Sequence, residues 1–208
     1  MTKVKKSSIL LTGLLLALLC GLLFYIDGNA SKYIIRITRL CAINIVLALS
    51  MNLVNGFTGI FSLGHAGFMA IGAYTVALLT IPVAKKETIF MLEPLVAPLN
   101  TLTLPFGAAL IIGGLLAAAL AFLIGLPCLR LRGDYLAIAT LGFSEIIRIV
   151  ITNAQSLTNG AQGLKSIPAT ANIWWCYGVA LATVVFIALL ISSSYGRAFK
   201  AIREDEIA

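Results

Sequence analysis

The sequence predicts an all-α fold, a polytopic bundle of about six membrane-spanning helices that forms one transmembrane domain over residues 1–208. Two observations lead to this fold class. Hydrophobic residues make up 60% of the chain and charged residues only 11%, whereas soluble domains carry about a quarter charged residues. The hydrophobic residues also gather in stretches close to the roughly 20 residues that a helix needs to cross a bilayer. The surface of this chain is therefore suited to a lipid bilayer.

Six apolar stretches are expected to be spans. In chain order they cover about residues 9–26, 33–54, 60–81, 105–126, 135–153 and 173–192. No small-residue cleavage site follows the first stretch, so we interpret it as a retained anchor rather than a signal peptide. The apolar residues 88–104 contain Pro94 and Pro98 and are followed by Pro105. This segment is therefore expected to be an external or re-entrant piece and not a full span.

The fourth span carries small residues at every fourth position, which places them on one face of a helix. They are Ala109, Gly113, Ala117, Ala121 and Gly125. Small side chains allow a neighbouring helix to approach closely. We favour ordinary packing within the chain over a dedicated dimer motif as the reason for this pattern.

Lysine and arginine residues set the expected orientation, because they are enriched on the cytoplasmic side of membrane proteins. With the N-terminus in the cytoplasm, the cytoplasmic side holds Lys3, Lys5, Lys6, Arg130, Arg132, Arg197, Lys200 and Arg203. The outside then holds Lys32, Arg36, Arg39, Lys85, Lys86 and Lys165. The net charge of +7 thus reflects topology, and no run of basic and aromatic residues indicates nucleic-acid binding.

Asparagine, glycine and serine interrupt the chain where the second span passes into the third, at residues 52–67. Interrupted helices are tolerated in a bilayer only where they are buried in protein or line a cavity. In transporters they often lie near the substrate path. The candidate translocation-path residues here are Asn52, Asn55, Ser62 and His65. A tight turn explains the glycines of this stretch as well, and such a histidine is more often hydrogen-bonded to a neighbouring helix.

Glu145 and Arg148 lie three residues apart in the fifth span and therefore share one face of its helix. An unpaired charge at that depth is costly, so a pair or a polar cavity is expected. We include both residues in the candidate translocation path. A structural pair that fixes the position of the helix is an equally good explanation.

Charged residues also mark a short turn before the fifth span. Arg130, Arg132 and Asp134 are expected to form this cytoplasmic turn. Asp134 is placed to cap the helix that follows and to favour its positive N-terminal end.

The last residues, 196–208, follow an apolar span and are rich in good helix formers. Phe199, Ile202 and Glu206 fall near one face of the expected helix. A short amphipathic helix of this kind can insert into a groove on a partner. A charged end that only fixes topology is the alternative.

Four stretches of the sequence resemble a known family. They are NLVNGFTGIFSLGHAGFMAIGAYTVALLT (52–80), LRLRGDYLAIATLGFSEIIRIVITN (129–153), LTNGAQGLKSI (157–167) and GRAFKAIREDEIA (196–208). The chain resembles the permease subunits of ABC importers for branched-chain amino acids, specifically the M-type (LivM-like) subunit. The stretches cover over a third of the chain, and the second is the most specific. In the third, the family usually has a Gly-Gly-Pro-like turn where this chain has NGAQ at 159–162.

The resemblance implies a permease for leucine, isoleucine or valine in the bacterial inner membrane. It implies as partners two ATPase subunits, a second homologous permease subunit, a periplasmic substrate-binding protein and the lipid bilayer. The chain would begin a cytoplasmic coupling loop that docks on an ATPase subunit through Gly196, Arg197, Phe199, Ile202, Arg203, Glu204, Asp205 and Glu206. Family members continue beyond this point with further spans, so the chain is expected to be the front part of a longer protein.

No catalytic residue, cofactor site or metal site is expected in the sequence. It has one histidine and no G-x-x-x-x-G-K-[ST] motif, so ATP is expected to be bound by the partner subunits. An ABC permease for another substrate, such as other amino acids, urea or aromatic acids, is the first alternative. An ion-coupled secondary transporter is the second, and Glu145 is its one candidate carboxylate.

Overall fold

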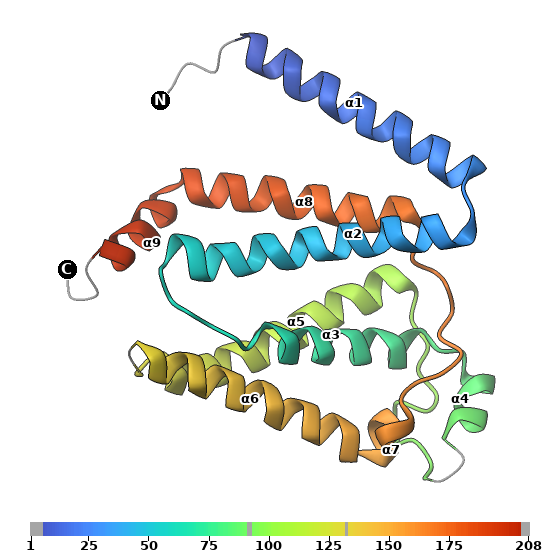
Figure 1. Cartoon of the computed structure of the whole chain (residues 1–208). Coiled ribbons are helices and arrows are strands. Elements are labelled where there is room, and N and C mark those ends of the chain that lie inside the picture. The colour runs from blue at the N-terminus through green and yellow to red at the C-terminus, as the bar shows by residue number, and fades with distance from the viewer. Residues whose placement is uncertain (1–5, 91–92, 132, 205–208) are drawn as a thin grey trace. The chain divides into compact units, whose positions relative to one another are not determined.

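The computed structural model describes residues 6–90, 93–131 and 133–204, with side chains described from residue 13 onward (Figure 1). The described residues form helices and loops, with no β-strand among them. The α-helices are α1 Lys6–Asn29, α2 Lys32–Met51, α3 His65–Thr80, α4 Val83–Ile89, α5 Phe106–Cys128, α6 Asp134–Asn153, α7 Gln155–Thr158, α8 Ile173–Ser192 and α9 Ser194–Glu204. A π-helix, η1, covers Asn52–Phe57 directly after α2, and a short 3-10 helix, η2, covers Gly160–Gln162. The expected all-α fold is confirmed.

Four helical stretches are long and apolar enough to cross a membrane. They are Lys32–Phe57, Phe106–Cys128, Asp134–Asn153 and Ile173–Ser192, and they match four of the expected spans. A fifth span requires α3 and α4 together, and these helices are bent by 119° at the break between them. The expected first span lies in α1, whose described apolar part is the shorter Gly13–Asn29. The expected third span begins five residues late, because the chain is not helical between Thr58 and Gly64.

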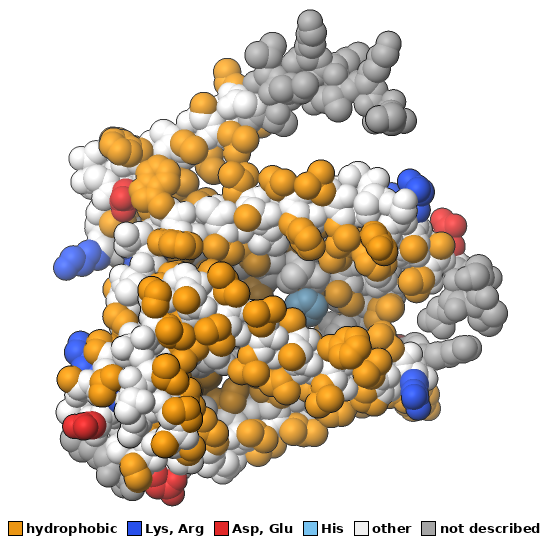
Figure 2. Space-filling model, turned by 180° about the vertical axis from the view of Figure 1, so that it is seen from behind, with side chains coloured by type: hydrophobic (Ala, Val, Ile, Leu, Met, Phe, Trp, Pro, Cys, Tyr) orange, Lys and Arg blue, Asp and Glu red, His pale blue; other side chains and the backbone are white. Residues whose placement is uncertain are grey.

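The chain divides into two compact units. The first comprises Met1–Ala48 and Ala171–Phe186, and the second comprises Leu49–Thr170 and Ile187–Ala208. In the first unit, Ala42 and Ile173 are completely buried, whereas large apolar side chains such as Phe24 are exposed. Figure 2 shows hydrophobic side chains spread over the face of the described chain that is in view, with few charged side chains among them. This apolar surface is the one expected of helices that face lipid.

In the second unit, α3 packs against both α5 and α6. The contact with α5 depends on small residues, because Ala109 is fully buried and a Cβ added at Gly113 would lie 3.1 Å from the carbonyl oxygen of Gly72. The interpretation of the small-residue stripe as packing within the chain is confirmed at this end of α5. At Gly125, by contrast, an added Cβ would meet no described atom within 4 Å. Close helix approach therefore uses only part of the stripe.

The segment between α4 and α5 is held by one buried lysine. Lys86 is 2% exposed, and its Nζ donates to the carbonyl oxygens of Leu99 at 2.7 Å and Leu102 at 2.6 Å. Nearby, the backbone N–H of Leu104 donates to the carbonyl oxygen of Leu79 at 2.8 Å. The described residues from Phe90 to Pro105 contain no α-helix, so the expectation that 88–104 is not a full span is confirmed.

Candidate functional site at the break after α2

After α2 the chain departs from α-helix at asparagine, threonine and glycine residues. The polar side chains among them form hydrogen bonds that compete with those of a regular helix. Short polar side chains compete for backbone groups, and glycine gains little from helix formation. The Oδ1 atom of Asn55 accepts a hydrogen bond from the backbone N–H of Ser62 at 3.2 Å, and the Thr58 hydroxyl donates to the carbonyl oxygen of Val54. Gly59 then takes a positive φ of 71°, which glycine adopts without steric cost. The sequence thus builds an ordered break between η1 and α3.

The far end of the break is attached to α6. The backbone N–H of Leu63 donates to Oγ1 of Thr140 at 3.0 Å. A Cβ added at the neighbouring Gly64 would lie 3.4 Å from the carbonyl oxygen of Thr140, so the chain passes close to the α6 backbone there. Polar contacts at both ends therefore hold the non-helical segment, as irregular backbone at membrane depth requires.

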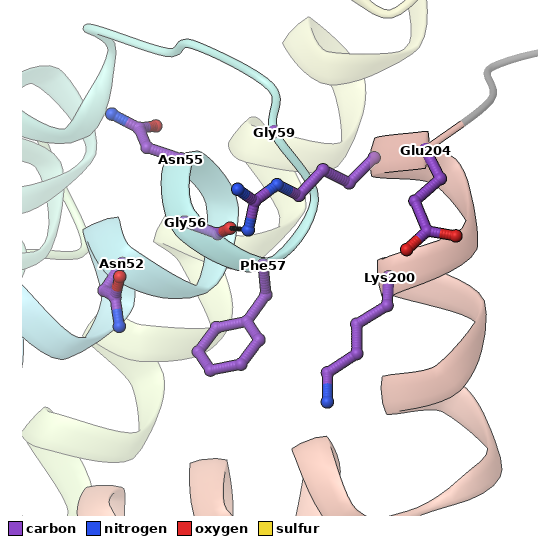
Figure 3. A pocket seen from close by; sticks show the side chains of 8 residues that line it. Asn52, Asn55, Gly56, Phe57, Gly59, Lys200 and Glu204 are labelled. Atoms are coloured by element: carbon purple, nitrogen blue, oxygen red, sulfur yellow. Dashed lines mark hydrogen bonds between the residues drawn. The ribbon is translucent and has the colours of Figure 1, made fainter.

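A cleft of about 940 Å³ opens beside this break (Figure 3). Its lining residues are Asn52, Asn55, Gly56, Phe57, Gly59, Lys200, Arg203 and Glu204. The cleft unites two sets that were predicted separately, since two asparagines come from the candidate translocation path and Arg203 and Glu204 come from the candidate coupling segment. Figure 3 shows Lys200 and Glu204 projecting from α9 on the side that faces η1. Amide, cationic and carboxylate groups are thus presented to one space.

Arg203 makes a direct bond across this cleft. Its Nη1 donates to the carbonyl oxygen of Gly56 at 3.1 Å, which Figure 3 marks as a dashed line. The two residues are 147 positions apart in the sequence. The bond places a cation at the C-terminal end of η1, where helical carbonyl groups lack partners and the helix dipole favours positive charge.

A second cavity, of about 610 Å³, lies beside the same loop. It is lined by Gly59, Ile60, Phe61, Leu129, Leu131, Gly133, Asp134, Leu136 and Ile202. Ile202 of α9 and Asp134, the first residue of α6, therefore line a common space. Gly59 lines both cavities.

The other residues of the predicted translocation path are not in the cleft. Ser62 contributes its backbone N–H to the break, and His65 is the half-buried first residue of α3. Glu145 and Arg148 pair on α6, where Nε of Arg148 donates to both carboxylate oxygens of Glu145 at 3.1 and 2.9 Å. The side chains are 51% and 66% exposed, so the expected pair forms on an open face of the described chain.

The turn between α5 and α6 corrects one detail of the sequence analysis. Gly133, with φ 55°, occupies the N-cap position of α6, and no side chain caps the helix there. The prediction that Asp134 caps this helix is wrong, because the aspartate is the first residue inside it. The carboxylate still lies in the first turn, where the helix dipole favours negative charge. Arg130 is exposed in this turn, and Arg132 lies outside the described residues.

The predicted coupling segment forms a helix whose residues differ in burial. Gly196 is buried and Phe199 is half-buried, whereas Ile202 is 42% exposed. Arg197 is exposed and donates from Nη2 to the hydroxyl of Ser194 at 2.9 Å. Asp205 and Glu206 lie outside the described residues. The helical expectation for this segment is confirmed as far as Glu204.

Four residues that line the cleft were not among the candidate site residues: Gly56, Phe57, Gly59 and Lys200. Thr140, which anchors the break, was not among them either. The Thr58–Gly59 pair already indicated a turn, which was a usable signal for Gly59. Thr140 lies in an otherwise regular span, and its hydrogen bond to Leu63 joins positions 77 residues apart. No local pattern identifies such a contact.

The fold and the site define a polytopic α-helical membrane protein in which one span is broken and lined by polar groups, an arrangement typical of transport proteins. A family model described as the permease component of branched-chain amino acid transport systems matches residues 33–208, and the chain belongs to this family.

Curated relatives carry matching descriptions. The chain is 38% identical to the high-affinity branched-chain amino acid transport system permease protein LivM of Escherichia coli K12, over 86% of this chain and 45% of the relative. The protein of the same name from Salmonella typhimurium is 37% identical over the same shares. The probable branched-chain amino acid transport permease protein LivM of Methanocaldococcus jannaschii is 24% identical over 77% of this chain and 54% of that protein. The chain thus spans about half the length of these relatives, and no solved structure matches it significantly.

Proposed function

We propose that this chain belongs to the permease subunit of an ABC importer that carries leucine, isoleucine or valine across the bacterial inner membrane. The similarity to relatives named as high-affinity branched-chain amino acid permeases supports the substrate class. The observation that carries the mechanism is the cleft between the broken span and α9. On one side of this cleft is the broken span, which can line a solute path. On the other side is α9, an amphipathic helix that can contact a partner.

In this proposal the N-terminus and α9 lie in the cytoplasm, as the distribution of lysine and arginine favours. Two ATPase subunits bind ATP and dock on the coupling segment that α9 begins. A second, homologous permease subunit completes the pathway, and a periplasmic binding protein delivers the amino acid. Nucleotide binding shifts the assembly between outward-open and inward-open states.

The chemistry of the cleft fits a zwitterionic solute. A free amino acid carries a carboxylate and an ammonium group, which complement Lys200 and Glu204 respectively. The amides of Asn52 and Asn55 can bond to either group because each amide both donates and accepts. Branched aliphatic side chains are expected to be selected chiefly by the binding protein.

Transport by the full-length protein with its partner subunits in proteoliposomes tests this function. We expect uptake of labelled leucine that requires both ATP and the binding protein and is competed by isoleucine and valine. If urea or aromatic acids compete with the uptake and isoleucine does not, the transporter has another substrate. Uptake that continues without ATP and collapses with an ionophore would overturn the proposal in favour of a secondary transporter.

The docking role of α9 has its own test. Replacing Phe199 and Ile202 together by aspartate puts two charges on the apolar side of the helix, so the ATPase subunits are expected to be lost on purification. Thr103→Asp, an exposed position between α4 and α5, is the control for added charge. Equal recovery of the ATPase subunits with both variants would contradict docking through this helix.

A further inference from the structure

The break after α2 is fastened to α9 at two neighbouring points. The first is the bond from Nη1 of Arg203 to the carbonyl oxygen of Gly56. A carbonyl near the end of a helix has no regular partner within the helix, and hydrogen bonds to charged donors are stronger than neutral ones. Arg203 therefore caps η1 from a different part of the chain.

The second point is the contact between Arg203 and Gly59. A Cβ added at Gly59 would lie 3.0 Å from Cγ of Arg203 and 3.6 Å from its Cα. The backbone of the break thus runs directly against the stem of the arginine and against the α9 backbone. Because Gly59 also has a φ of 71°, both its conformation and its surroundings disfavour any larger residue.

From these two contacts we infer that Arg203 is a positioning residue that makes α9 and the η1 break move together. This inference rests on the proposed function, in which α9 receives the motion of an ATPase subunit. A displacement of α9 pulls on the carbonyl of Gly56 and pushes on Gly59. The displacement is passed within η1 from Gly56 to Asn52, whose Oδ1 lies directly against the position that a Cβ on Gly56 would take. In this inference, the helix that contacts the ATPase subunit therefore also moves the asparagines that line the cleft.

Arginine has properties for this task that lysine lacks. Its planar guanidinium donates in a fixed geometry, and its stem can pack against a backbone while the head remains bonded. Lys200 lies one turn earlier on α9 and lines the same cleft, so a cation alone is already available there. The inference thus assigns to Arg203 a geometric role in addition to its charge.

The link itself is tested in the full-length protein without reference to transport. Cysteines at Phe57 and Lys200, which line opposite sides of the cleft, are joined by a short bifunctional thiol reagent in a background free of native cysteine. With Arg203→Gln the cross-linking rate is expected to fall by about tenfold, the factor for loss of one hydrogen bond to a charged group. Arg36→Gln, which removes an exposed arginine outside the cleft, should leave the rate unchanged. An unchanged rate with Arg203→Gln overturns the link.

The transmission of motion is tested in the complete transporter. A cysteine at Met51, an exposed position just before η1, is labelled by a thiol reagent with and without vanadate-trapped nucleotide. We expect the nucleotide-dependent change in labelling to be lost with Arg203→Gln and with Gly59→Ala, and to be partly kept with Arg203→Lys. Gly114→Ala, where an added Cβ meets nothing within 4 Å, is the matched control for the glycine variant.

Two failures of this experiment have different meanings. The positioning role is overturned if the Arg203→Gln transporter keeps the full labelling change. This conclusion applies when the ATPase subunits of that variant still co-purify and hydrolyse ATP. Absence of ATPase subunits from the unmodified transporter overturns the proposed function instead. A reduced cross-linking rate with Arg203→Gln would still support the internal link in that second case.

Discussion

The backbone of Gly67 on α3 lies directly against Ser144 on α6, so close that an added Cβ would stand 3.1 Å from Cα of Ser144 and 2.9 Å from Cδ1 of Ile147. Gly67 is one turn or less from the end of the break. This crossing therefore fixes the start of α3, and with it the position of the polar segment that precedes it.

The first prediction concerns this crossing. Gly67→Ala is expected to destabilise the protein by about 1–3 kcal/mol, because neither backbone can give way without disturbing the packing. Thermal unfolding of the detergent-solubilised protein measures the effect. Gly142→Ala on α6, where an added Cβ meets nothing within 4 Å, should be neutral or slightly stabilising. Equal losses from both variants would show that the close approach does not matter.

The second prediction concerns the anchor of the break. Thr140→Val keeps the shape of the side chain but removes the acceptor for the Leu63 N–H, at a cost of about 1–3 kcal/mol for an unsatisfied donor. Hydrogen exchange at Leu63 should become faster. In Thr152→Val, the lost hydroxyl bonds only to carbonyl groups of its own helix, so exchange at Leu63 should not change. Unaltered exchange in Thr140→Val would contradict the anchoring role.

The third prediction concerns the buried lysine. Lys86→Met fills a similar volume but leaves the carbonyl groups of Leu99 and Leu102 without their charged donor, and hydrogen bonds to charged groups contribute about 1.5–3 kcal/mol each. The segment between α4 and α5 should become more sensitive to limited proteolysis. Lys85→Met, at the exposed neighbouring position, is the control and should not change the cleavage rate.

The fourth prediction concerns the pair on α6. Replacing either Glu145 or Arg148 by alanine leaves a single charge on an open helix face, whereas replacing both leaves none. The double variant is therefore expected to be milder than either single variant in expression and thermal stability. Additive losses in this double-mutant cycle would show that the two side chains do not act as a pair.

Much of the fold could be predicted because hydrophobic length is a local property. The ends of α5, α6 and α8 lie within a few residues of the predicted spans, since a helix of about 20 residues matches the bilayer wherever it occurs. The prolines of 88–104 likewise indicated correctly that no span crosses there. The helical form of α9 followed from its composition alone.

The site could be predicted only in part, because its contacts join distant positions. The asparagines of the break and the arginine of α9 were each identified, but nothing local reveals that Arg203 bonds to Gly56. Lys86 was assigned to topology from its charge, whereas the structure buries it among carbonyl groups that a sequence pattern does not locate. The prediction that Asp134 caps α6 was wrong because Gly133 occupies the N-cap position. Gly133 has a φ of 55° and no side chain, so the usual pattern of polar capping residues does not identify it.

Gly59 lines both the 940 Å³ cleft and the 610 Å³ cavity. The loop that it belongs to is therefore part of the boundary of both spaces. A shift of this loop changes the shape of both spaces in a single movement, so an event at one of them is felt at the other. A larger residue at this position would reach into that shared boundary.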